Sequence, residues 1–313
     1  STMIDFRYHL VSLISVFLAL AVGVVLGAGP LQNSLGTALN DQVTALRENR
    51  NATQAKLEQT ETAVNERDSY ITQAASSLLP GTLASKSVAM VLLPDAKAED
   101  ADAITTQLKS AGATVTGRVS MTSTWVDVSR ENYRSNLSGQ VQGHLGSASS
   151  QDANGILGEA LAKALTANDD SSRVLMDMLS VDKAGTPFVT VDSTPTGPAE
   201  MIVVVGPRPQ ASSGKGATVE ASPGQDPKAW AKALAGTAGR APTVVVGSAD
   251  GDDNVVSIIR SEGAKVTTID SVGQVAASVS TPLALALVST RVGTIGHYGF
   301  DKGADAVMPP VTK

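Results

Sequence analysis

The spacing of apolar and polar residues divides the chain into three parts. Residues 10–29 are almost entirely apolar, residues 35–79 are mostly polar with an apolar residue at every third or fourth position, and residues 86–313 contain short apolar runs between amphipathic stretches. These patterns are typical of a membrane-spanning helix, a long exposed helix and an α/β domain, respectively. We therefore predict a transmembrane helix, a coiled-coil helix and an α/β domain built on a parallel sheet.

The apolar stretch 10–29 is long enough to cross a bilayer. As a helix it spans roughly 30 Å, about the thickness of the hydrocarbon core. No Lys, Arg, Asp or Glu occurs between Arg7 and Asp41. A cleaved secretory signal and a buried core helix are the alternatives. Because Arg7 precedes the span, the positive-inside rule places residues 3–9 in the cytoplasm and the rest of the chain outside it.

Two patterns predict self-association. Gly23 and Gly27 form a G-x-x-x-G motif, which lets two membrane helices approach closely. A heptad spacing then provides one mostly apolar set of positions: Val43, Leu57, Val64, Ile71 and Leu78. Arg50 interrupts this set, and the alternate set is poor in apolar residues. We expect a parallel homodimer through these positions; the alternative is an amphipathic helix that lies along its own domain.

The third part contains a repeated β-α-β unit. The segments 108–116 and 259–267 are identical at five of nine positions, and each precedes or enters a predicted strand. Apolar runs at 87–93 and 242–248 supply the first strand of each unit. Right-handed crossovers would make both strand pairs parallel. We expect one α/β domain over 86–313, or two pseudo-symmetric lobes that share core layers.

Other elements are expected between and after the two units. The run at 201–206 is typical of a buried strand, and residues 153–167 and 172–182 have helical spacing. The last helix is expected from Pro282 to about Arg291. Stretches rich in Gly, Pro and Ser predict loops, at residues 192–198 and 207–227.

Composition limits the possible partners. The net charge is −6 and the sequence has no basic run, which argues against nucleic acid. The chain has no cysteine, which excludes disulfides, thiolate metal sites and a Cys nucleophile. Aromatic residues are only 3% of the chain, so Ala, Val, Leu and Ile must fill the core.

The sequence lacks the usual motifs for catalysis and nucleotide binding. No glycine-rich fingerprint follows the strands at 87–93 and 242–248, and no G-x-S-x-G occurs. The Gly-Lys pair in Ser212–Thr218 has the wrong spacing for a P-loop and predicts a solvated turn. We therefore predict no enzyme activity and no cofactor, although a nucleotide- or sugar-binding α/β enzyme is a distant alternative, with its ligand near Pro94 and Gly247.

No metal site is predicted either. The three histidines, His9, His144 and His297, are widely separated and are expected at the surface or in structural roles. Two acidic clusters precede predicted helices and suit the helix dipole: Glu99, Asp100 and Asp102, and Asp250, Asp252 and Asp253. Copper sites use Cys, Met and His, but Met176 and Met178 lie in a stretch that predicts core packing.

Two stretches carry a resemblance to a known family: RYHLVSLISVFLALAVGVVLG at Arg7–Gly27 and, after the polar helix, SVAMVLLPDA at Ser87–Ala96. They resemble the MctB family of mycolic-acid bacteria, and the organisation matches over nearly the whole chain. That family is commonly described as copper transport outer-membrane proteins. It is also similar to SteB, a membrane partner of SteA in corynebacterial cell separation, which is linked to control of peptidoglycan hydrolases.

These two implied roles make different physical demands. An outer-membrane channel needs a closed barrel or a helical ring with a lipid-facing apolar surface, and neither pattern is present in the sequence. We therefore predict a non-catalytic, single-pass scaffold of the cytoplasmic membrane, with a homodimeric extracytoplasmic part and a SteA-like cytoplasmic or membrane partner. The alternative is a copper efflux or channel component in the outer membrane.

Overall fold

The computed structural model describes residues 2–181, 187–210 and 223–312. The chain forms two compact units, Ser1–Arg67 and Asp68–Lys313. The first unit contains helix α1 (Thr2–Ala28) and most of helix α2 (Pro30–Leu78). Every side chain described between residues 5 and 62 is exposed. Within a single chain, this unit therefore has no core of its own.

Helix α1 contains all but the last residue of the predicted span. Among the described residues it lies in the one segment that is long and apolar enough to cross a membrane. Gly29 separates it from α2, which begins at Pro30, five residues before the predicted start. Proline suits the first position of a helix because an N–H at that position would have no intrahelical acceptor, so no hydrogen bond is lost. As predicted, α2 ends just before Pro80 and Gly81, and Gly81 has a φ of +86°.

The second unit is built on one mixed sheet of seven strands, in the order β3-β2-β1-β4-β5-β6-β7. The strands are β1 (Ser87–Leu92), β2 (Thr114–Met121), β3 (Val189–Ser193), β4 (Met201–Val205), β5 (Thr243–Val246), β6 (Thr267–Ile269) and β7 (His297–Tyr298). All neighbours are parallel except β2 and β3. The predicted α/β fold on a largely parallel sheet is confirmed. Strand β3 is the exception, because the chain re-enters the sheet beside Met121 and runs back along β2.

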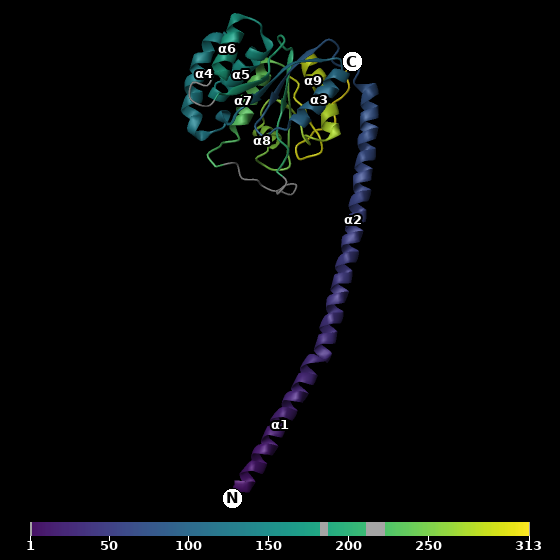
Figure 1. Ribbon diagram of the computed structural model, residues 1–313. Helices are drawn as coiled ribbons and strands as arrows, with labels where there is room; N and C mark the ends of the chain where they lie inside the picture. The colour runs from purple at the N-terminus through teal and green to yellow at the C-terminus, as the bar shows by residue number, and fades with distance from the viewer. Residues whose placement is uncertain (1, 182–186, 211–222, 313) are drawn as a thin grey trace. The chain divides into compact units, whose positions relative to one another are not determined.

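Helices cover both faces of this sheet. Figure 1 shows α4 (Glu131–Leu145), α5 (Ala153–Thr166), α6 (Asp170–Ser180) and α7 (Ala229–Arg240) on one side, and α3 (Ala98–Ser110) and α9 (Val275–Thr290) on the other. Helix α8 (Val255–Glu262) shares the first apolar core with α5 and α7. The second core joins the end of α2 to α3 and α9. The result is a three-layered α/β/α arrangement.

Both predicted β-α-β units are confirmed as parallel pairs, β1-α3-β2 and β5-α8-β6. They lie in the two halves of one sheet, and their helices pack in different cores. The strand order reverses between β1 and β4, which is the topological switch point of a doubly wound fold. Ligands of open α/β sheets bind beside the carboxyl ends of the strands at such a switch point.

Some boundaries differ from the expectation. Helix α9 begins at Val275, so Pro282 lies inside it and not at its start. Residues 275–281 have no strong apolar period of their own, and burial against the sheet stabilises them as helix. The expected loop at 192–198 begins with the last two residues of β3. His144 lies in the last turn of α4. The Gly-Lys pair in Ser212–Thr218 falls outside the described residues.

Candidate functional site

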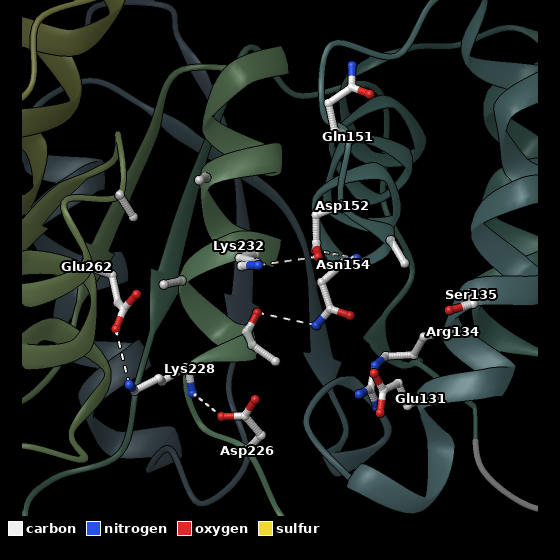
Figure 2. Close-up of a pocket in the computed structure, with 15 residues that line it drawn as sticks. Glu131, Arg134, Ser135, Gln151, Asp152, Asn154, Asp226, Lys228, Lys232 and Glu262 are labelled. Atoms are coloured by element: carbon white, nitrogen blue, oxygen red, sulfur yellow. Dashed lines mark hydrogen bonds and ion pairs between the residues drawn. The ribbon is translucent and has the colours of Figure 1, made fainter.

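A polar pocket of about 700 Å³ lies between the starts of α4, α5 and α7. Figure 2 shows charged side chains of both signs around it. Lys232 lies 3.5 Å from Asp152, and Lys228 lies 3.5 Å from Glu262. The charges are therefore largely balanced within the wall. Such a pocket offers hydrogen bonds to a polar ligand but no net field for a strongly charged one.

The deepest part of this pocket is fixed by two buried side chains. Arg134 donates hydrogen bonds to the carbonyl oxygens of Thr124 at 2.9 Å and Asp127 at 2.6 Å. Asn154 donates to Trp125 O at 2.9 Å and to Ala229 O at 3.3 Å (Figure 2). Burial lowers the pKa of Arg134, although Glu131 and other nearby acids oppose this effect. Both side chains hold loops together, so their first role is structural.

The switch point between β1 and β4 is occupied by an ion pair. Arg208, just after β4, donates to both carboxylate oxygens of Asp100 at 2.9 and 2.6 Å, and lies 2.9 Å from Glu99. The hydrogen bonds to Asp100 raise the pKa of Arg208. A Cβ at Gly273 would lie 2.6 Å from Arg208 Nε, so this loop also closes on the pair. A buried carboxylate at the start of α3 is unfavourable for a phosphate, which makes nucleotide binding here unattractive.

A second buried network lies at the end of β6. The carboxylate of Asp270 accepts hydrogen bonds from Arg260 at 3.0 Å and from the backbone N–H groups of Phe300 at 2.9 Å and Asp301 at 3.1 Å. A Cβ at Gly299 would collide with this carboxylate, and Gly299 has a φ of +133°. Asp270 and Arg260 are both buried. The network therefore fixes the C-terminal segment to the sheet.

The acid clusters and histidines also have structural surroundings. Asp102 pairs with Arg118 at 2.8 Å, in addition to the contacts of Glu99 and Asp100 with Arg208. His297 Nδ1 lies 2.7 Å from the hydroxyl of Thr268, which is fully buried and so cannot serve as an accessible nucleophile. His9 lies on α1.

No group of three or more His, Cys, Asp or Glu able to hold a metal is found in the described ranges. Met176 and Met178 are half-buried against the core around α5 and α6, as predicted from their spacing. The described residues therefore offer no carboxylate or imidazole cage for copper, and these two methionines contribute to packing.

The predicted dimerisation residues fall into two groups. Gly23 and Gly27 have no neighbouring atom within 4 Å of where a Cβ would be, and Val43, Leu57 and Val64 are 43%, 50% and 45% exposed. Ile71 and Leu78 are half-buried, and Ile71 packs against the second core. Within one chain the first group is uncovered, and the last turns of α2 lie against their own domain.

Sequence reasoning missed the partners that shape these sites. No motif marks Arg208 or Asp270 in the sequence, and Arg260 was noted only as part of the repeated segment 259–267. The one available signal was position, since Arg208 and Asp270 each follow a buried strand. Their pairing depends on which strands become neighbours, and the linear sequence does not state that.

Comparison with known proteins places the chain in a family. The family described as "Copper transport outer membrane protein, MctB" matches residues 3–309. Proteins named "Copper transporter MctB" from Mycobacterium tuberculosis and Mycobacterium bovis are 29% identical over 97% of this chain and 99% of their own length. The protein of that name from Mycobacterium leprae is 29% identical over 98% of this chain and all of its own length. With the matched segment running from the apolar helix through the last strand, the chain belongs to the MctB family.

Proposed function

We propose that this chain is a single-pass envelope protein, anchored in the cytoplasmic membrane by α1, that acts as a homodimer and presents its α/β domain outside the cytoplasm as a non-catalytic scaffold. The observation that carries the proposal is the pairing of an apolar helix with an uncovered apolar stripe on α2. Residues 10–29 match the bilayer in length, and membership of the MctB family fits an envelope protein.

The uncovered stripe supports the homodimer. Most helical stability in proteins comes from packing of an apolar face against a neighbour. Val43, Leu57 and Val64 recur at heptad positions and are exposed in the single chain. A second α2 in parallel would cover all three and would also bring the G-x-x-x-G motifs of two α1 helices together.

The dimer is tested by substitutions on two faces of α2. We expect the double substitution Leu57→Asn and Val64→Asn to weaken self-association by at least tenfold, because two buried apolar contacts per helix are replaced by amides. Analytical ultracentrifugation of the full chain in detergent measures this. Ala55→Asn, on the opposite face, is the matched control. An unchanged dimer in the double variant, or an equal loss in the control, contradicts the proposal.

The short N-terminal segment bears on the partner. Residues 3–9 lie on the cytoplasmic side in this topology, so a SteA-like partner would bind that segment or insert a membrane segment of its own. A pull-down from native membranes tests this, with separation of the inner and outer membrane layers. Recovery of the chain in the outer layer contradicts the anchor in the cytoplasmic membrane.

Copper transport is the second candidate, and the names of the relatives favour it. Copper transport requires that the chain either form a channel or regulate a channel formed by another protein. Deletion of the gene should raise cellular copper if the chain exports the metal. Complementation with the Leu57→Asn and Val64→Asn variant then separates the two roles. A scaffold requires the dimer for its function, whether or not cellular copper changes in this variant.

A further inference from the structure

The second unit has an exposed apolar groove that the packing of the domain leaves uncovered. It has a volume of about 340 Å³ and lies between the last turns of α2, helix α9 and the C-terminal segment. We call it the α2–tail groove and define it by Tyr70, Ile71, Leu78, Phe300, Val307 and Met308. Tyr70 is 78% exposed, Phe300 55% and Val307 60%. Contiguous exposed apolar patches mark interaction sites, whereas single exposed apolar side chains need no such explanation.

The groove is preformed. The backbone N–H of Phe300 is held by the buried carboxylate of Asp270, and Gly299 N donates to Ala306 O at 3.0 Å. Asp305 N donates to His297 O at 2.7 Å, which adds a second tie. The wall that carries Phe300 and Val307 is therefore fixed before any partner arrives, so little conformational entropy is lost on binding.

The heptad positions of the apolar residues on α2 indicate what covers the groove. Ile71 and Leu78 occupy the same heptad position as Leu57 and Val64, and residues seven apart on a helix differ by only about 20° in direction. Ile71 and Leu78, the last two members of this heptad set, line the groove. In a parallel pair of α2 helices, the residues that face each other beyond Val64 are those that line the groove.

The coiled coil alone also needs this extra surface. Between Val43 and Val64 the first heptad set contains Arg50, and the alternate set contains Leu46 followed by Thr53 and Thr60. Stable coiled coils need three to four heptads with both sets apolar. Specific interfaces bury at least about 1,000 Å². The alternate heptad set contributes little apolar contact. The groove supplies contiguous apolar surface at the domain end of α2, beside Ile71 and Leu78.

From these observations we propose that the α2–tail groove is the domain end of the homodimer interface and that apolar side chains from the segment Asp68–Leu78 of a second copy fill it. This inference rests on the homodimer of the proposed function. Tyr70 of one chain would then lie near Phe300 of the other, which ties the α/β domains to the coiled coil. Binding of an amphipathic helix in an apolar groove is a common recognition mode.

Cross-linking of the full chain tests the arrangement. The chain has no cysteine, so each substitution introduces the only thiol. Two populations with different tags are mixed in detergent, exchanged and reconstituted into nanodiscs, one with Tyr70→Cys and one with Phe300→Cys. A short bismaleimide should link the two tags. Val292→Cys replaces Phe300→Cys in the control; Val292 is 91% exposed and lies outside the groove, and it should give no product.

The outcomes separate this inference from the dimer itself. Val64→Cys should form a disulfide between copies if α2 pairs. That disulfide without a Tyr70–Phe300 product overturns the groove assignment and leaves the dimer intact. Absence of both products overturns both.

A charge in the groove gives a second measurement. Val307→Asp should weaken self-association at least tenfold, while Val292→Asp should change it less than twofold. Both side chains are exposed, so the fold is retained, and circular dichroism checks this. Equal effects of the two substitutions would also overturn the assignment.

Discussion

At the scale of single residues, buried charges in the second unit are held by several hydrogen bonds each. Glu159, in the middle of α5, is fully buried and accepts from the N–H groups of Ser149 and Ser150, both at 3.1 Å, and from Arg240 Nε at 3.1 Å. Burial alone would raise the pKa of Glu159, but these hydrogen bonds outweigh it and lower the pKa. The ionised carboxylate thus fixes the loop before α5.

Loss of the negative charge on Glu159 should destabilise the domain. Glu159→Gln should lower the free energy of unfolding by about 3 kcal/mol, because Arg240 keeps its charge and loses its partner. Urea unfolding followed by circular dichroism measures the loss. Glu200→Gln is the control, since Glu200 pairs with Lys86 at the surface at 3.3 Å and should cost less than about 1 kcal/mol. Similar losses in the two variants would argue against a special role for the buried pair.

His297 makes the stability depend on pH. Burial lowers its pKa from the ordinary 6.5, and Arg260 lowers it further, whereas Asp305 opposes the shift. The native state therefore binds a proton less readily than the unfolded state. The free energy of unfolding should fall as the pH drops below 6.5 and level off below the native pKa of His297.

Thermal unfolding between pH 7.5 and pH 5 tests this dependence. His297→Gln should flatten that part of the profile, because an amide keeps a hydrogen bond to Thr268 and does not titrate. Val292→Gln, at a position that is 91% exposed and carries no titratable group, is the control and should leave the slope unchanged. A slope that persists in the His297 variant would assign the effect to another group.

At the scale of elements, α5 and α7 pack backbone against backbone. A Cβ at Gly158 would lie 1.9 Å from Ala233 O, and a Cβ at Gly236 would lie 2.0 Å from Gly155 O. The hydroxyl of Thr237 donates to Gly158 O at 3.1 Å across the same contact. These glycines let the two backbones touch, and backbone cannot move aside as a flexible side chain can.

Gly158→Ala should therefore destabilise the domain. We expect a loss of about 3 kcal/mol, since the added methyl group forces the helices apart. Gly139→Ala on α4 is the matched control; Gly139 is exposed with open space around it, and alanine there should add up to about 1 kcal/mol. Unfolding of both variants in urea measures the difference. A neutral Gly158→Ala would mean that α5 and α7 can separate at little cost.

The elements also show where sequence patterns predict structure and where they fail. Strands β1, β4 and β5 are continuous apolar runs because they are buried on both faces, and this makes them recognisable. Strand β3 lies at the edge with four of its five residues exposed, so its pattern is weak. Helix α9 is buried nearly all round, which removes the helical period that would have marked its start at Val275.

At the scale of the whole molecule, the distribution of metal ligands leads to a prediction about copper. The chain has no cysteine and three separated histidines. We expect no stoichiometric binding of Cu(I) at micromolar concentration in a competition assay with a chromogenic chelator, with a known copper chaperone as the positive control. Tight binding by the full chain would favour a direct role in copper transport, and a change in cellular copper without binding would favour an indirect one.

The sequence by itself determined the order of the parts: an apolar span, a polar helix with a heptad stripe and an α/β domain with two parallel β-α-β units. It could do so because these features depend on local period and length, which are written along the chain. The tertiary structure alone decided that β3 runs antiparallel, that Arg208 meets Asp100 and that Phe300 stands beside Tyr70. Those contacts join residues that lie far apart in the sequence, and only the order of strands in the sheet brings such residues together.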